Sequence, residues 1–504
     1  MPELTRRNLL RGAAGLTGVL SLGGLAACGR GDGSTAAGGS AGVVRNGTGR
    51  VVTARLVPRP TSLDLGGRVA ATWAYGDSVP GPLLRATAGE VLRVHVDNGL
   101  PAETTVHWHG IALRNDMDGV PGMTQDPIPS GGRFTYEFVV PDPGTYFYHP
   151  HVGVQLDRGL YGALVVDDPA EPGRYDHEWV VVLDDWLDGT GRTPDQALAG
   201  LRPDNGAGSG ASDPGGGDGM AGMDGMDHGA TGGMGEGAQS PLLGGAGDVT
   251  YPYFLVNGRT PNDPVSLAAK PGQRVRIRFV NAGSDTAFRV ALGGHRMTVT
   301  HSDGFPVVPL ATDALVIGMG ERFDVTVTLG DGAFPLVASA EGKDGQGLAV
   351  VRTSSGPTPT GQARPRELAG RVVLGTDLVP ADDARLSRRQ VDRRHDLLLA
   401  GSMKPYRWTI NGRTFPDAEP LPVTAGERVR LRFVNMSMMF HPMHVHGHTF
   451  AEVASGVRKD TVIVRPMQAL TVDLDADNPG QWATHCHNIY HAETGMMTSL
   501  TYTA

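Results

Sequence analysis

The feature that most constrains this chain is a run near its C-terminus, from His485 to Met496, with the sequence HCHNIYHAETGM. The start of the run has strand-like composition, and neighbouring side chains of a strand point to opposite faces. Cys486 therefore faces one way, while His485 and His487 face the other. Cys486, with His491 and Met496 just beyond it, supplies part of the ligand set of an electron-transfer blue copper site. The two histidines behind it can hold a second metal centre.

Three further clusters each contain a His-x-His pair, whose members share a face in an extended chain. The pairs are His107 with His109, His149 with His151, and His444 with His446. In the last cluster His441 lies an odd number of residues before the pair, so it occupies the opposite side, where it can join Cys486 and His491. The consistent parity of four clusters favours bound metal over separate packed histidines. The number of candidate ligands argues against a zinc site, because zinc needs only three or four ligands.

These residues closely resemble the four copper-binding motifs of the multicopper oxidases, the laccase and cuprous-oxidase family, from about Val51 to the C-terminus. The closest likeness is to copper-tolerance oxidases of actinobacteria, especially mycobacteria. The resemblance implies four copper ions: one type 1 ion held by His441, Cys486 and His491 with Met496 axial, one type 2 ion held by His107 and His444, and two type 3 ions, one held by His109, His149 and His487 and the other by His151, His446 and His485. His448 matches no ligand position of the family, and we expect it to pack behind the ligands.

The resemblance also implies an oxidoreductase that couples four one-electron oxidations at the type 1 copper, passed on through Cys486, to the reduction of O2 to water at the trinuclear copper cluster. Asp118 matches an acidic residue that the family keeps near the type 2 copper. Many bacterial members carry an acid directly after the last type 1 histidine, where this chain has Ala492 followed by Glu493. We expect either Glu493 or water with Asp118 to relay protons.

The reducing substrate is predicted from methionines, whose soft thioethers favour Cu(I). Met439 matches a substrate methionine of bacterial cuprous oxidases and Met438 lies beside it, although Ser437 replaces the acid expected there. A Gly-rich stretch adds Met220, Met223, Met226 and Met234. We therefore expect oxidation of toxic Cu(I) outside the cytoplasm. Two alternatives stay open: a laccase-like phenol oxidase, and a non-enzymatic copper-sequestering or envelope-structural protein. Separately, Met438 and Met439 can be read as ordinary core methionines, and the Gly-rich stretch as a flexible insertion with accidental methionines.

An internal repeat predicts the fold. Residues 86–98 recur as 269–281 and 424–435, each a glycine turn followed by an alternating strand, as in antiparallel sandwiches. We expect an all-β chain of three cupredoxin-like Greek-key β-sandwich domains, with the trinuclear site between the first and third. The predicted segments are an export signal 1–28, a flexible tether 29–50, domain 1 at 51–169, domain 2 at 170–355 with a Met/Gly-rich insertion 202–247, a linker 356–385 and domain 3 at 386–504.

The N-terminus predicts export. Arg6 and Arg7 resemble a twin-arginine signal, and Cys28 follows a sequence typical of lipoprotein processing, although plain secretion and a membrane anchor are alternatives. We expect a periplasmic or cell-envelope protein, lipid-anchored at Cys28 and monomeric. The chain has two cysteines, so lipidation of Cys28 and copper at Cys486 leave no disulfide. A net charge of −9 without a basic stripe argues against nucleic acid. O2 and either Cu(I) or a small reductant are the expected partners.

Overall fold

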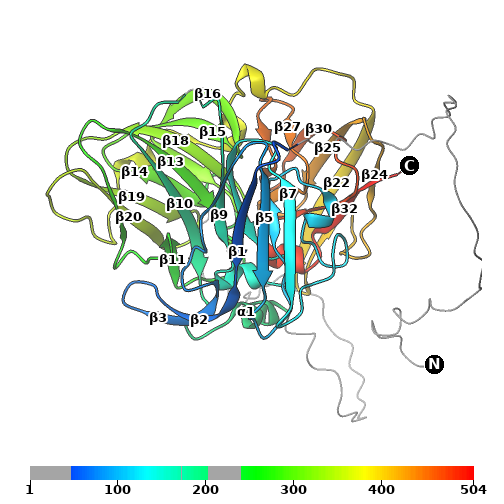
Figure 1. Ribbon diagram of the computed structural model, residues 1–504, viewed down its shortest axis with the longest axis horizontal. Coiled ribbons are helices and arrows are strands. Elements are labelled where there is room, and N and C mark those ends of the chain that lie inside the picture. Colours follow the sequence, from blue (N-terminus) through cyan, green and yellow to red (C-terminus); the bar gives the residue numbers. More distant parts are fainter. Residues whose placement is uncertain (1–46, 172, 203–239, 504) are drawn as a thin grey trace, which may run out of the picture. The chain divides into compact units, whose positions relative to one another are not determined.

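The computed structural model describes residues 47–171, 173–202 and 240–503. The export signal with Cys28, and Met220, Met223, Met226 and Met234, lie outside the described residues. Within them, no helix has both the length and the apolar character needed to cross a membrane. The described strands form three pairs of sheets and one separate hairpin, and the pairs can be followed in Figure 1 from blue and cyan through green to orange and red.

The first pair of sheets lies within residues 51–167. One sheet has the order β1 (Val51–Leu56), β5 (Val91–Asp97), β7 (Arg133–Val139), and the other has the order β4 (Leu84–Thr87), β9 (Gly162–Asp167), β8 (Gly144–His149), β6 (His107–His109). A separate hairpin joins β2 (Pro58–Asp64) and β3 (Val69–Tyr75), and the short helices are η2 (Asn115–Met117) and η3 (Gln155–Arg158). Strands β6 and β8 carry the first two His-x-His pairs or lead directly into them.

The second pair lies within residues 177–373. One sheet runs β11 (Tyr253–Val256), β10 (His177–Trp186), β13 (Arg274–Asn281), β18 (Arg322–Thr328), β15 (Met297–Ser302), β16 (Phe305–Thr312). The other runs β12 (Val265–Ala268), β20 (Gln346–Arg352), β19 (Ala333–Ala340), β14 (Phe288–Leu292), β17 (Ala314–Ile317), β21 (Val372–Val373). Helices α1 (Pro194–Leu201) and η5 (Arg366–Ala369) accompany them. Because β21 pairs with β17, part of the expected linker 356–385 completes this sandwich.

The third pair lies within residues 393–502. One sheet runs β23 (Tyr406–Ile410), β22 (Arg393–Met403), β25 (Arg428–Asn435), β30 (Ala469–Asp475), β27 (Phe450–Glu452), β28 (Arg458–Lys459). The other runs β24 (Leu421–Val423), β32 (Met497–Tyr502), β31 (Gln481–Cys486), β26 (His441–Val445), β29 (Thr461–Val464). Helices η6 (Gly375–Asp377) and η7 (Asp382–Ala384) precede these strands, and α2 (Ile489–Glu493) follows β31.

The internal repeat has the same place in all three sandwiches. The repeat forms strands β5, β13 and β25. Each pairs in parallel with an earlier strand of the same sheet, which is β1, β10 and β22 respectively. Each also pairs antiparallel with a later strand, which is β7, β18 and β30 respectively. Gly89, Gly272 and Gly426 precede them with φ of 86°, 80° and 88°, a conformation that favours glycine. The predicted all-β class with three cupredoxin-like sandwiches is confirmed.

The end of the expected insertion 202–247 is packed rather than loose. Leu243 is fully buried in an apolar cluster that joins the second and third sandwiches, with Phe440 and Ile463 from the third. Ser240 donates a hydrogen bond of 2.6 Å from its hydroxyl to Glu341. This packing fixes the chain immediately before Asp248, a residue that becomes important at the metal site.

We expect Leu243→Ala to lower the free energy of unfolding by ~2–5 kcal/mol, because it removes a buried leucine from this interface and leaves a cavity. The neighbouring Leu242 is only partly buried, so Leu242→Ala should cost ~1 kcal/mol or less. Urea unfolding of the metal-free variants measures both values. Equal unfolding midpoints for the two variants would contradict the packing described here.

Candidate metal centre

Cys486 and two histidines form the first candidate site. Cys486 ends β31, opposite Met443 of β26 in the antiparallel register. Its Sγ lies 3.7 Å from Nδ1 of His441 and 3.6 Å from Nδ1 of His491, and these two nitrogens lie 3.1 Å apart. All three side chains are fully buried. The structure thus brings His441 and His491 together with Cys486, on the side of the strand where they were predicted.

Met496 lies beside the same site. Its backbone N–H donates to the carbonyl of His491 at 2.9 Å, and its own carbonyl accepts from the N–H of Cys486 at 3.1 Å. The side chain is fully buried in the apolar core. These backbone bonds hold Met496 next to Cys486 and His491, so its buried thioether could serve as a weak axial ligand.

The outward nitrogens of both histidines have hydrogen-bond partners. Nε2 of His441 lies 2.9 Å from the hydroxyl of Ser437, and Nε2 of His491 lies 2.9 Å from a carboxylate oxygen of Asp248. Asp248 also accepts from the hydroxyl of Tyr406 at 2.6 Å. Burial opposes ionisation of Asp248, but the hydrogen bonds hold its pKa below the ordinary value. Sequence reasoning missed Asp248, because no spacing rule connects it to a histidine that lies far along the chain.

The second candidate site gathers the four His-x-His pairs where the first and third sandwiches meet. Strand pairing places His107 opposite His149 and His444 opposite His485. Ligand nitrogens of three histidines lie within 4.8 Å of one another in each of three groups: His107, His109 and His444; His109, His149 and His487; and His151, His446 and His485. The last two groups are the expected type 3 sets, and the first contains the expected type 2 pair.

Buried nitrogens without hydrogen-bond partners test whether copper fits here. Among the described residues, the buried ring nitrogens that have no hydrogen-bond partner include Nε2 of His107, His149 and His444, Nδ1 of His109, and both nitrogens of His487. Several of the opposite nitrogens are bonded: Nδ1 of His107, His149 and His444 lies 2.9 Å from the carbonyl of Asp118, Pro150 and Asp460 respectively. Hydrogen bonds of this kind fix the tautomer and leave a lone pair for a metal. The donor set therefore fits the copper ions that the motifs imply.

Burial favours the neutral form of eight of the ligand histidines, which is the form that binds a metal. Burial, followed by repulsion between neighbouring imidazoles, lowers the pKa of most of them well below the ordinary value: His109, His149, His151, His441, His444, His446 and His487. Burial also lowers the pKa of His485 to about 4. Burial raises the pKa of Cys486, so the metal-free cysteine is a thiol that must lose its proton to bind copper.

The two predicted proton-relay residues, Asp118 and Glu493, adjoin different histidines of the cluster. Asp118 is fully buried, with one carboxylate oxygen 3.2 Å from Nδ1 of His107 and the other 2.9 Å from Nδ1 of His446. Glu493 ends α2 and lines a cavity of about 20 Å³ together with histidines of the cluster, including His149 and His487. A cavity of this size can hold a water molecule. Burial raises the pKa of Glu493.

Two of the predicted substrate methionines, Met438 and Met439, directly follow Ser437, whose hydroxyl contacts His441. Met438 is 70% exposed, whereas Met439 is partly buried. Sequence reasoning missed Met467, which is 60% exposed and whose backbone N–H donates to the carbonyl of Ser437 at 3.2 Å. His448 packs on Tyr502, whose hydroxyl lies 2.7 Å from its Nε2, and it belongs to none of the metal-ligating groups found among the described residues.

Comparisons with known proteins agree with this geometry. Multicopper oxidase family models match residues 59–171, 178–356 and 389–504. The chain is 49% identical to Multicopper oxidase MmcO of Mycobacterium tuberculosis over 100% of both chains. It is 30% identical to a Copper resistance protein A homolog of Pseudomonas syringae, over 86% of this chain and 90% of the relative.

The crystal structure of Fet3p, a multicopper oxidase that functions in iron import, shares the fold with a TM-score of 0.74 at 19% identity, over 90% of each chain. The family predicted from the motifs is thereby confirmed, as is the likeness to a mycobacterial member. The chain belongs to the multicopper oxidase family and is an oxidoreductase with copper cofactors.

Proposed function

We propose that the protein is a cuprous oxidase of the cell envelope, which oxidises toxic Cu(I) with O2 as the electron acceptor. It would hold four copper ions, one type 1 at His441, Cys486, His491 and Met496, and one type 2 and two type 3 among the eight histidines of the cluster. Export by the twin-arginine route and a lipid anchor at Cys28 complete the proposal, since both follow from the N-terminal motifs. We propose that it acts as a monomer.

Bound copper supplies one-electron exchange at the cysteine site and the reduction of O2 to water at the histidine cluster. The polypeptide itself connects the cysteine site with the histidine cluster. Cys486 is covalently joined to His485 and His487, which turn to the opposite side of the strand, so a short covalent path links the two donor sets. Asp118 orients His107 and His446, and Glu493 with the water-sized cavity offers a position from which a proton can reach the cluster.

One observation carries the choice of Cu(I) as substrate: exposed methionines surround Ser437, whose hydroxyl contacts His441. Met436, Met438 and Met467 are 54%, 70% and 60% exposed. Large apolar side chains are normally buried, whereas exposed thioethers are suitable ligands for Cu(I). Asp248 adds a carboxylate at His491, and relatives named copper resistance proteins support the same role.

We expect the purified protein to bind ~4 copper ions per chain and to show an intense blue thiolate absorption band, which disappears in Cys486→Ser because the sulfur ligand is lost. Copper analysis and visible spectroscopy measure both properties. The chain's other cysteine provides the control, since Cys28→Ser should keep the band. A band that survives in Cys486→Ser would contradict the assignment.

We expect replacement of Met436, Met438 and Met467 by leucine to raise the KM for Cu(I) by ~10-fold, equivalent to ~1.4 kcal/mol of lost binding, with the blue band unchanged. Leucine keeps the apolar volume and removes only the thioether. Met123→Leu is the control, because Met123 packs against a cluster of Val120, Ala483 and Met497 instead.

The same preparations should be assayed with a substituted phenol. We expect the triple variant to oxidise the phenol at the wild-type rate. Negligible turnover of Cu(I) by the copper-loaded wild type, with rapid turnover of the phenol, would establish a laccase-like phenol oxidase instead. Failure of the fully loaded protein to consume O2 with either reductant would favour a copper-sequestering protein.

A further inference from the structure

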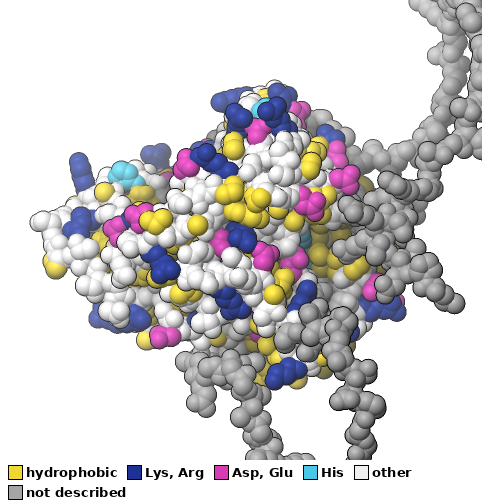
Figure 2. All heavy atoms as spheres, turned by 90° about the horizontal axis from the view of Figure 1, so that it is seen from below, with side chains coloured by type: hydrophobic (Ala, Val, Ile, Leu, Met, Phe, Trp, Pro, Cys, Tyr) yellow, Lys and Arg dark blue, Asp and Glu magenta, His cyan; other side chains and the backbone are white. Residues whose placement is uncertain are grey.

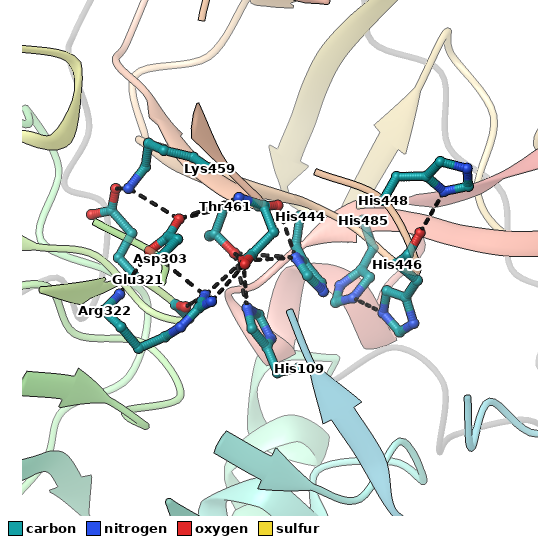
Figure 3. A network of polar contacts seen from close by, with 12 residues as sticks. His109, Asp303, Glu321, Arg322, His444, His446, His448, Lys459, Thr461 and His485 are labelled. Carbon is teal, nitrogen blue, oxygen red and sulfur yellow. Dashed lines mark hydrogen bonds and ion pairs between the residues drawn. The ribbon is translucent and has the colours of Figure 1, made fainter. Parts of the chain in front are cut away.

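A buried network of charged side chains joins the second and third sandwiches behind the histidine cluster (Figure 3). Its charged members are Asp303, Glu321 and Arg322 from the second sandwich and Lys459 and Asp460 from the third, all at most 1% exposed. Lys459 lies 3.0 Å from Asp303 and 3.1 Å from Glu321. Buried charges are costly unless they are paired and hydrogen-bonded, so the network holds these two sandwiches in one arrangement.

Arg322 contacts all three sandwiches. Its Nη1 and Nη2 each donate to a different carboxylate oxygen of Asp460 at 2.6 Å, a bidentate pair. Its Nε donates to the carbonyl of Thr145 in the first sandwich at 3.0 Å, and the guanidinium lies over the ring of Tyr146. A lysine could keep the charge at this position but not the fork of donors.

Asp460, held in this way, contacts two cluster histidines. One of its carboxylate oxygens lies 3.1 Å from Nε2 of His109, and its carbonyl lies 2.9 Å from Nδ1 of His444. The hydroxyl of Thr461 lies 2.9 Å from the same Nε2 of His109 and donates to Asp460 at 2.8 Å. These partners occupy Nε2 of His109 and leave its Nδ1, which is buried and unpaired, toward the other histidines.

Two glycines show how tightly these groups pack. A Cβ added to Gly110 would lie 2.5 Å from Nη2 of Arg322 and 2.6 Å from a carboxylate oxygen of Asp460. A Cβ on Gly320 would lie 2.8 Å from the ring of His487 and 3.0 Å from that of His109. The second sandwich therefore packs directly on the cluster rings, although none of the predicted ligands comes from it.

We propose that Arg322 is a positioning residue for the trinuclear histidines: through its bidentate pair with Asp460, it fixes the two acceptors that orient His109 and His444 and so determines copper occupancy at the type 2 site and the adjoining type 3 site. The inference rests on the proposed function, because it concerns the copper ions assigned there. It adds a role for the second sandwich, which acts through Asp460 rather than by touching a metal.

The test compares Arg322→Lys with Arg276→Lys in the full-length protein. Arg276 is also buried and donates through Nε and Nη2 to a buried carboxylate, but its partners are Asp324 and Glu171 rather than Asp460. Arg322→Lys should weaken copper binding at the cluster by ~10-fold or more, the usual effect of losing a hydrogen bond behind a ligand. The readouts are copper per chain, the electron paramagnetic resonance signal of type 2 copper and the blue band of the cysteine site.

The expected result is loss of cluster copper and of the type 2 signal in Arg322→Lys, with an intact blue band, while Arg276→Lys keeps the full set. Wild-type copper content and type 2 signal in Arg322→Lys, or an equal loss of copper in Arg276→Lys, would overturn the proposal. A wild type that lacks cluster copper altogether would instead refute the proposed function.

If Arg322→Lys does not fold, Thr461→Val tests the same connection, because it removes the hydroxyl that links Asp460 to His109 and keeps the shape of the side chain. Thr461→Ser, which restores the hydroxyl, is its matched control. Loss of cluster copper in Thr461→Val and recovery in Thr461→Ser support the proposal. Full copper in Thr461→Val overturns it.

Discussion

The antiparallel pairing of β26 with β31 is the interaction on which both metal sites depend. This register sets His444 opposite His485 and Met443 opposite Cys486. Because alternate side chains of a strand face opposite sides, the same two strands present imidazoles to the first sandwich and a thiol to the interior of the third. A shift of one residue in this pairing would exchange the two faces and dismantle both sites at once.

Burial is the second constraint, and it acts on the ligands before any metal arrives. His149, His444 and His487 have lowered pKa values because the protein has removed them from water and crowded them together. An unpaired buried nitrogen is unfavourable, so the apoprotein carries a cost that copper coordination relieves. The charged network behind the cluster has three carboxylates and two cations, Arg322 and Lys459, and one of these carboxylates, Asp460, contacts His109. Together with Asp118, which contacts His107 and His446, it places carboxylates beside the histidines, and these favour a cationic occupant.

The sequence alone was sufficient to predict the features that depend on local backbone geometry. Strand parity grouped His441 with Cys486 and the His-x-His pairs with one another, and the repeated glycine turns predicted three sandwiches. Local sequence could not find Asp248, Met467 or Arg322, because each meets its partner across a domain boundary or from another loop. The partners are His491, Ser437 and Asp460 respectively. Such contacts depend on how the sandwiches dock, and neither periodicity nor spacing encodes docking. The packed residues near Leu243 were missed for the same reason, since their composition continues that of the Gly-rich stretch before them.

The division of ligands between the first and third sandwiches has a consequence for biogenesis. The histidines at 107, 109, 149 and 151 are synthesised long before those at 444, 446, 485 and 487, and neither sandwich alone contains all the ligands of the histidine cluster. A truncated or misdocked polypeptide therefore cannot acquire the full metal complement, whatever the local concentration of copper. Full copper loading therefore requires a chain that is complete and whose first and third sandwiches are correctly docked.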